Sequence, residues 1–274
     1  MVNTTYDPQK WVAAKDACLD AIQSATAVGH QLYKFTDLLP IGEINDVIRQ
    51  ELTTRGTLTD RYNEELIWGV GPNWTRDLQD WSQPRWTGDH TAQHNSSKKT
   101  HAPTLNIVED FYTVNGVPIN EDTTWDFENR YDITTVTDQA AEDHKYYIQN
   151  GYTTAKLHTY RESRFYSTIG FDGGKWFSME TSDVEDLPYL NVRAGQRSGK
   201  QGFELYSITG YFAKKLVNYE NIITTNNITI EGYTFPIIRL SDLYLMYAEA
   251  LNEVKETPDA EVYEYIQKVR YKAG

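Results

Sequence analysis

The segment FPIIRLSDLYLMYAEALNE, residues 235–253, decides the fold of this chain. Its apolar residues recur at the spacing of one helix face, and they are Leu240, Leu243, Tyr244, Tyr247, Ala248 and Leu251. Pro236 marks the end of an extended stretch, and the small side chains of Ala248 and Ala250 let a neighbouring helix approach closely. A broad apolar stripe of this kind is typical of a helix packed in a core. The segment therefore predicts a buried helix over residues 240–253.

A second helix is predicted after a short turn. Its apolar stripe consists of Val262, Ile266 and Val269. Thr257 and Pro258 supply residue types that favour a helix start. Helices joined by so short a connection usually fold back on each other. We therefore expect residues 240–253 and 258–271 to form an antiparallel helical hairpin.

Three further helices are predicted from capping residues and apolar spacing. The first covers residues 7–28, where Asp7 can cap the helix. The second covers residues 43–55 and is expected to end at Gly56, because glycine commonly terminates helices. A short helix is expected within residues 102–111.

Composition excludes several classes of protein. The chain has 274 residues and a net charge of −13, which opposes nucleic-acid binding because phosphates need lysine and arginine. No apolar run approaches the ~18 residues of a membrane span, and no secretory signal is visible at the N-terminus. Cys18 is the single cysteine, so an intrachain disulfide cannot form. The 7 Trp and 20 Tyr indicate either an aromatic core or a surface that binds amphipathic ligands.

Several segments resemble, in chain order, the motifs of the SusD/RagB family. They are KWVAAKDA (10–17), NEELIW (63–68), PTLNIVEDF (103–111), YRESRFYSTI (160–169), TGYFAKK (209–215), PIIRLSDLYLMYAEALNE (236–253) and VRYKAG (269–274). Ser163 stands where the family usually has proline, and Lys272 replaces an arginine. The resemblance covers the chain from about residue 7 to residue 274.

The resemblance implies a mainly α fold, in which tetratricopeptide-like helical hairpins accompany a long loop-rich, aromatic-bearing region and a few short strands. It implies one domain over residues 1–274, as the middle fragment of a longer protein. The expected function is nutrient binding at the cell surface. A lipoprotein of the outer membrane would capture oligosaccharide or polysaccharide for import through a TonB-dependent, SusC-like transporter, with no cofactor and no chemistry on the ligand. The alternatives are a SusD-like binder of a non-glycan nutrient such as peptide, and a helical glycoside hydrolase.

Residues 69–103 lack lasting periodicity and predict a long loop, which in a compact chain is usually functional or disordered. Sugars have an apolar C–H face and a rim of hydroxyls, so an aromatic ring and nearby polar groups can bind them together. The candidate ligand-binding residues are Trp74, Trp81 and Trp86 as ring platforms, with Asn73, Arg76 and Asp80 as polar partners. Trp68 ends an apolar run and is expected in the core. The next candidate is the aromatic stretch around Tyr160, Tyr166 and Trp176.

Neither a metal site nor a catalytic residue is predicted. His90 and His94 have metal-like spacing, but Thr91 occupies the position where a metalloprotease helix needs glutamate. His101 could supply a third ligand, but solvated loop histidines are expected. The acids Glu121, Asp122, Asp126, Glu128 and Asp132 are expected to form a solvated acidic face. Structural ion-pair roles are expected for Arg161 and Arg164, and Arg239 is expected to be a buried arginine that bonds carbonyls or a carboxylate.

Overall fold

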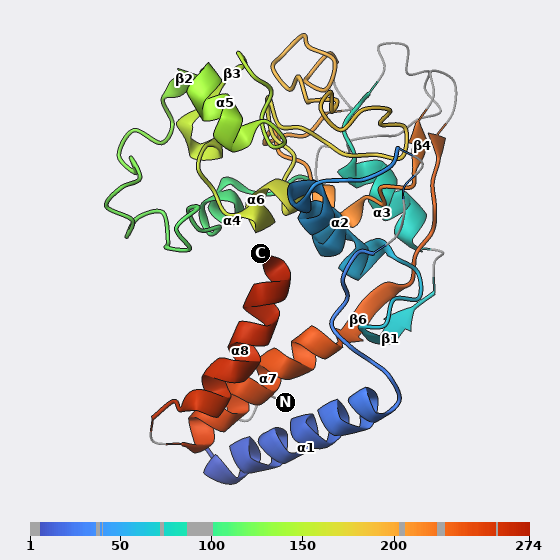
Figure 1. Ribbon diagram of the computed structural model, residues 1–274, viewed down its shortest axis with the longest axis vertical. Coiled ribbons are helices and arrows are strands. Elements are labelled where there is room, and N and C mark those ends of the chain that lie inside the picture. The colour runs from blue at the N-terminus through green and yellow to red at the C-terminus, as the bar shows by residue number, and fades with distance from the viewer. Residues whose placement is uncertain are drawn as a thin grey trace.

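The computed structural model describes residues 6–36, 39, 41–71, 74–86, 101–202, 206–223, 228–255 and 257–274. A three-helix arm lies below a larger, loop-rich head (Figure 1). The arm comprises α1 (Pro8–Ala27), α7 (Leu240–Val254) and α8 (Ala260–Ala273). In the described part of the chain, helices are the main regular structure, so the predicted mainly α class is confirmed.

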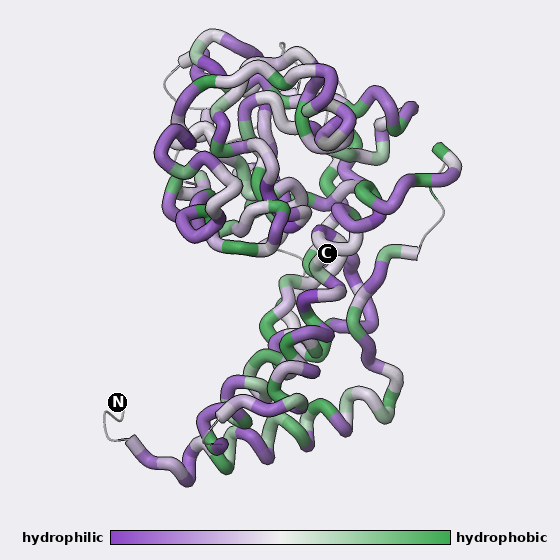
Figure 2. The backbone as a smooth tube through the Cα atoms, turned by 60° about the vertical axis from the view of Figure 1, so that its left-hand side comes forward, coloured by the Kyte–Doolittle hydropathy of each residue, from purple (hydrophilic) through white to green (hydrophobic). Residues whose placement is uncertain are grey.

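The buried helix predicted for residues 240–253 is confirmed by α7. All six stripe residues are buried on α7, which packs against both α1 and α8. Hydrophobic and hydrophilic residues alternate along the three helices where they extend from the head (Figure 2). Pro236 does not end the extended stretch, because β6 (Phe235–Arg239) continues to the start of α7. The cap of α8 is also not the predicted one, since Asp259 accepts from the backbone N–H groups of Glu261 and Val262.

The first predicted helix is confirmed by α1, which Asp7 caps through the N–H of Gln9. The predicted end of the second helix is wrong, because α2 (Asp46–Thr59) passes through Gly56. The ring of Tyr33 lies so close to Gly56 that a Cβ there would come 2.6 Å from its hydroxyl oxygen. Glycine at this position therefore serves close packing rather than helix termination.

The head contains short helices joined by long connections. These are α3 (Thr75–Ser82), α4 (Leu105–Glu109), α5 (Asp138–His144), α6 (Ser163–Thr168), and the 3₁₀ turns η2 (Lys156–His158) and η3 (Lys214–Leu216). Among the described residues, the strands pair as three antiparallel ribbons: β1 (Leu66–Val70) with β6, β2 (Ile133–Thr135) with β3 (Thr153–Ala155), and β4 (Ile222–Ile223) with β5 (Ile228–Thr229). Within the described part of the chain, no helix combines the length and apolar character needed to cross a membrane.

The prediction of a loop over residues 69–103 is wrong for Thr75–Ser82, which form the helix α3. Helical periodicity is hidden there because the buried face of the helix is polar, consisting of Thr75, Gln79 and Ser82. The Gln79 side chain donates to the carbonyl of Glu231 and accepts from the N–H of Asn218. Buried polar groups are tolerated when they are hydrogen-bonded, which an apolar-periodicity search cannot detect.

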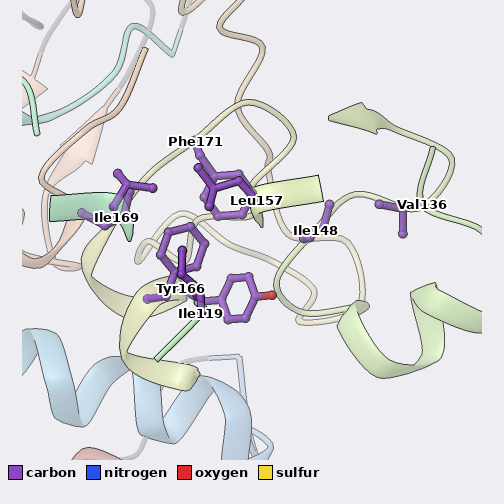
Figure 3. Packing of buried hydrophobic residues seen from close by; sticks show 9 residues of the cluster. Ile119, Val136, Ile148, Leu157, Tyr166, Ile169 and Phe171 are labelled. Carbon is purple, nitrogen blue, oxygen red and sulfur yellow. The ribbon is translucent and has the colours of Figure 1, made fainter. Parts of the chain in front are cut away.

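The centre of the head is an aromatic and aliphatic cluster around α6 (Figure 3). Its buried members are Val108, Ile119, Val136, Ile148, Leu157, Phe165, Tyr166, Ile169 and Phe171. Arg161 is buried beside this cluster and donates to the carbonyls of Val108, Phe111, Tyr112 and Leu157. The expected ion pair of Arg161 is therefore replaced by backbone hydrogen bonds.

The other two arginines form the expected ion pairs, Arg164 with Glu162 and Arg239 with Asp242.

A buried carboxylate, that of Glu65, connects the head with the arm. Glu65 is fully buried; its side chain accepts from the N–H of Tyr33 and forms an ion pair with Lys272 on α8.

Candidate functional site

The structure places Trp74 at the N-cap of α3 and Trp81 in the last turn of this helix. Trp74 is 78% exposed and Trp81 is 37% exposed. They are seven residues apart, so they lie about two turns and roughly 10 Å apart along the same side of the helix. Two aromatic rings therefore face solvent on α3.

The predicted polar partners do not accompany these rings. At about 100° per residue, Arg76 and Asp80 are turned away from both tryptophans by roughly 100° or more. Asp77 is the polar residue closest to them around the helix. Asn73 lies outside the described residues.

Two other tryptophans differ from expectation in opposite directions. Trp86 is half-buried, and its ring centroid lies 5.6 Å from that of the buried Trp176. It belongs to a small core rather than to an open platform. Trp68 was expected in the core but is 61% exposed. It belongs to a two-stranded ribbon, where side chains alternate between a covered and an open face.

A second candidate site is a cleft at the other end of the head, which we call the Trp125–Tyr160 cleft. Its volume is about 530 Å³, within the usual range for small-molecule pockets. It is lined by Val114, Asn115, Thr124, Trp125, Asp126, Thr134, Thr135, Val136, Thr137, Ala140, Lys156, Thr159 and Tyr160. In Figure 1, the elements around the cleft, β2, β3 and α5, lie far from α3 across the head. The two candidate surfaces are therefore separate.

Trp125 is held in a fixed orientation. Its indole N–H donates to the carbonyl of Thr159 over 3.1 Å. The guanidinium of Arg161 lies 5.7 Å from its ring centroid. A ring fixed before the ligand arrives loses little conformational entropy on binding, so Trp125 suits a stacking role.

Tyr160 has a positive φ of 54°, unlike every other described residue except glycines. A bulky residue in this left-handed region costs about 1–3 kcal/mol and persists only where surrounding contacts determine it. Its N–H donates to Nε2 of His144 over 3.2 Å, and its carbonyl accepts from Val114 over 2.9 Å. The side chain is 40% exposed. Backbone strain of this kind is often found at ligand sites.

The polar groups of the cleft are ordered by hydrogen bonds. Asp122 bonds to two residues that line the cleft, Asn115 and Thr124, and also to Thr113. Because its carboxylate accepts from all three side chains, the pKa of this carboxyl lies well below the usual range. The expectation of a solvated carboxylate is therefore wrong for Asp122, which is 9% exposed.

Within the cleft, Lys156 is paired with Asp126 over 3.0 Å. Hydrogen bonds from Lys156 and Asn129 lower the pKa of Asp126, and the bond to Asp126 raises that of Lys156. Both groups are charged at neutral pH, so the cleft contains one anion and one cation.

Tyr160 is the one residue of this cleft that was also a ligand-site candidate from the sequence. The walls of the cleft come from the loop around Asn115 and Trp125, from β2 and α5, and from the segment Lys156–Tyr160. The available signal was a run of threonines, asparagine and aromatic residues between two framework motifs, and this run has no fixed spacing.

The described residues contain no group of three potential metal ligands. His101 bonds to Ser82 and its ring lies near Trp81, and burial lowers its pKa. His90 and His94 lie outside the described residues.

Comparisons with known proteins agree with the fold. A solved structure of the protein BT4246 superposes with a TM-score of 0.74 at 24% identity, covering 100% of this chain and 46% of that one. A SusD-like protein (BF3747) from Bacteroides fragilis NCTC 9343 superposes with a TM-score of 0.58 at 17% identity, covering 96% of this chain and 45% of that one. The chain thus spans about half the length of these structures. No curated protein sequence matches it.

The model of the SusD family matches residues 64–274, most of the chain. This match includes the deciding segment 236–253 and the motifs at 103–111 and 160–169, so the resemblance seen in the sequence is confirmed. The chain belongs to the SusD family.

Proposed function

We propose that this chain captures oligosaccharide or polysaccharide at the cell surface, in the Trp125–Tyr160 cleft. The capture would serve import across the outer membrane through a TonB-dependent, SusC-like transporter. Family membership supports nutrient binding, because SusD-like proteins are binding proteins rather than enzymes. The family's tetratricopeptide-like arrangement of helices, with residues 1–274 as one domain, belongs to the same proposal.

The observation that carries the proposal is the composition of the cleft. Two aromatic rings, Trp125 and Tyr160, share it with Asn115 and with the threonines of residues 134–137. The rings can stack on the apolar face of a sugar, while the amide and hydroxyl groups bond to its rim. The fixed orientation of Trp125 and the constrained backbone of Tyr160 keep the surface preorganised.

The charges of the cleft favour an uncharged glycan. Asp126 and Lys156 neutralise each other, and the chain as a whole carries −13. A polyanionic glycan would therefore meet long-range repulsion without a compensating cationic site in the cleft. Neutral oligosaccharides should bind more tightly than uronic-acid polymers of similar length.

Replacing the fixed ring, in Trp125→Ala, is expected to weaken glycan binding about fivefold to tenfold. A stacked aromatic pair is worth about 1 kcal/mol beyond its buried area, and 1.4 kcal/mol is a factor of ten in affinity. The measurement is calorimetry with neutral gluco-, xylo-, manno- and galacto-oligosaccharides, using whichever binds the wild-type chain. Circular dichroism should show that the variant remains folded.

The double variant Trp74→Ala, Trp81→Ala is the matched comparison, because it removes the two exposed rings at α3, which belong to the candidate residues Trp74, Trp81 and Trp86 chosen from the sequence. We propose this platform as a secondary contact for long polymers. The double variant should weaken polymer binding in gel retardation and leave hexasaccharide affinity unchanged. If it abolishes hexasaccharide binding while Trp125→Ala does not, the primary site is on α3.

The chain is expected to release no product from any glycan that it binds. The two carboxylates at the cleft already have partners, since Asp126 is paired with Lys156 and Asp122 accepts hydrogen bonds from Thr113, Asn115 and Thr124. Reducing ends should stay constant during long incubation with each polysaccharide of the panel. New reducing ends that disappear in an Asp126→Asn variant would instead establish a hydrolase.

A further inference from the structure

We propose that a pocket at the junction of the head and the arm binds one small carboxylate anion. The pocket has a volume of about 240 Å³. The lining residues that matter for the anion are Thr54, Arg164, Lys215, Arg239, Asp242 and Lys272. The pocket shares no described lining residue with the Trp125–Tyr160 cleft, so the inference does not depend on the proposed glycan site.

The head and the arm are in direct contact beside this pocket. The Gln50 side chain of α2 donates to the carbonyl of Lys272, and the hydroxyl of Ser163 on α6 donates to that of Ala273. In Figure 1, the end of α8 accordingly lies close to α6 and α2. The pocket is lined from the head by α2, α6 and η3, and from the arm by the start of α7 and the end of α8. An anion bound here would therefore contact both parts of the molecule.

The charged side chains around the pocket do not balance. Four cationic side chains line it, and they are Arg164, Lys215, Arg239 and Lys272. Three of these cations pair with carboxylates, in the pairs Arg164–Glu162, Arg239–Asp242 and Lys272–Glu65. Lys215 forms neither an ion pair nor a hydrogen bond with any described residue. The pocket therefore has a surplus of one positive charge.

Several hydrogen-bond donors at the pocket also lack an acceptor among the described residues. Arg164 and Arg239 bond to their carboxylates through Nε and Nη2, which leaves Nη1 of each guanidinium available. Thr54 is 8% exposed, and its hydroxyl is buried without a described partner. A buried polar group is unfavourable unless it is hydrogen-bonded. Together with the ammonium of Lys215, these donors suit an oxyanion, whose oxygens only accept.

The electrostatics of Lys215 favour a bound anion. Burial lowers the pKa of its ammonium to about 8, and the positive charges of Arg239, Lys272 and Arg164 lower it as well. The ammonium is still mostly charged at pH 7, although its three cationic neighbours repel it. A nearby negative charge stabilises the charged form of a lysine. An anion in the pocket would therefore offset this repulsion.

The size and charge of the pocket select a small carboxylate. Its volume is below the ~300–1,000 Å³ of pockets that enclose drug-sized ligands. A carboxylate carries one negative charge at pH 7, which matches the surplus of one. A phosphate group carries about 1.5 to 2 negative charges and would exceed it. A short free acid and an acidic monosaccharide share this chemistry, and acetate and glucuronate distinguish the two sources.

The test measures thermal unfolding of the full chain by circular dichroism at pH 7.0. Sodium acetate, sodium D-glucuronate or sodium phosphate is titrated to about 20 mM, with sodium chloride keeping the ionic strength constant. Ligands that bind only the folded state raise Tm. Acetate or glucuronate should raise the Tm of the wild type by about 2–4 °C over chloride alone, and phosphate should raise it less. The carboxylate with the lower apparent Kd identifies the source as a free acid or an acid sugar.

Two variants assign the effect to the pocket. Lys215→Met should abolish the shift, and in chloride it should unfold at no lower temperature than the wild type, because it removes an unpaired cation from beside three others. Thr54→Val keeps the shape of the side chain and should weaken the apparent Kd about threefold to tenfold. Lys10→Met is the control, because Lys10 is exposed on α1 and the same charge is removed outside the pocket. This control should keep the full shift.

The inference is overturned if acetate and glucuronate shift the wild type and Lys215→Met equally. It is also overturned if phosphate gives a larger shift than either carboxylate, or if Lys10→Met loses the shift as well. Should Lys215→Met fail to fold, an unchanged apparent Kd in Thr54→Val overturns it instead. A Tm shift in wild type and Lys10→Met that is absent in Lys215→Met supports it, whether or not any glycan binds elsewhere.

Discussion

Replacing the buried carboxylate of Glu51, in Glu51→Gln, is expected to lower the free energy of unfolding by about 3–5 kcal/mol. Glu51 on α2 lies 2.8 Å from Arg55 and 2.8 Å from Lys214, and all three side chains are at most 5% exposed. In the variant, the two buried cations lose their anionic partner and keep only neutral acceptors, namely backbone carbonyls and one amide oxygen. Removing one partner of a buried ionic network leaves an uncompensated charge in the interior, which strongly destabilises the fold. This holds even where the complete network stabilises the protein no more than apolar residues would.

The measurement is urea unfolding of both proteins followed by tryptophan fluorescence. The matched control is Glu185→Gln, because Glu185 also pairs with a lysine but is 57% exposed. Exposed pairs of this type contribute about 0–1 kcal/mol. A loss below about 1 kcal/mol in Glu51→Gln, equal to the control, would contradict the interpretation.

The destabilisation in Glu51→Gln should depend on pH. Burial lowers the pKa of Lys214 to about 8, and the charge of Glu51 counteracts this shift. Without Glu51 the pKa falls further, so unfolding of the variant takes up additional protons below pH 8. Stability therefore rises with pH more steeply in the variant than in the wild type. The difference in unfolding free energy should be larger at pH 6 than at pH 8.5.

Replacing Arg161 by methionine is expected to cost roughly 3 kcal/mol or more of unfolding free energy. Its guanidinium donates to four backbone carbonyls, from Val108, Phe111, Tyr112 and Leu157. A buried acceptor left without a donor costs about 1–3 kcal/mol, so the effect exceeds the loss of one bond. Arg161→Lys should recover little, because an ammonium cannot reproduce the planar array of donors.

Arg164→Met is the control for Arg161→Met. Arg164 is three residues away and forms an ion pair with Glu162, but its side chain is 43% exposed. Its replacement should change the unfolding free energy by less than about 1 kcal/mol. Equal effects of the two substitutions in chemical denaturation would show that the carbonyl contacts of Arg161 are not the source of stability.

The sequence by itself determined the helical arm and the family. The stripe from Leu240 to Leu251 recurs at 3.6-residue spacing, and Asp7 lies directly before an apolar helix. Such signals are local, because one helix face must be apolar wherever it packs. Contiguous motifs such as PIIRLSDLYLMYAEALNE are likewise visible without knowledge of the fold.

Only the tertiary structure decided where the candidate ligand surfaces lie. The polar buried face of α3 hid a helix, because hydrogen bonds from distant residues replace apolar contacts there. Whether a tryptophan is exposed depends on what packs over it, so Trp68 and Trp86 differed from expectation. Trp125 and Tyr160 meet in one cleft because the chain folds back between them, and His144 reaches Tyr160 from a separate helix. These contacts join residues 16 or more positions apart, and no local pattern encodes such a meeting.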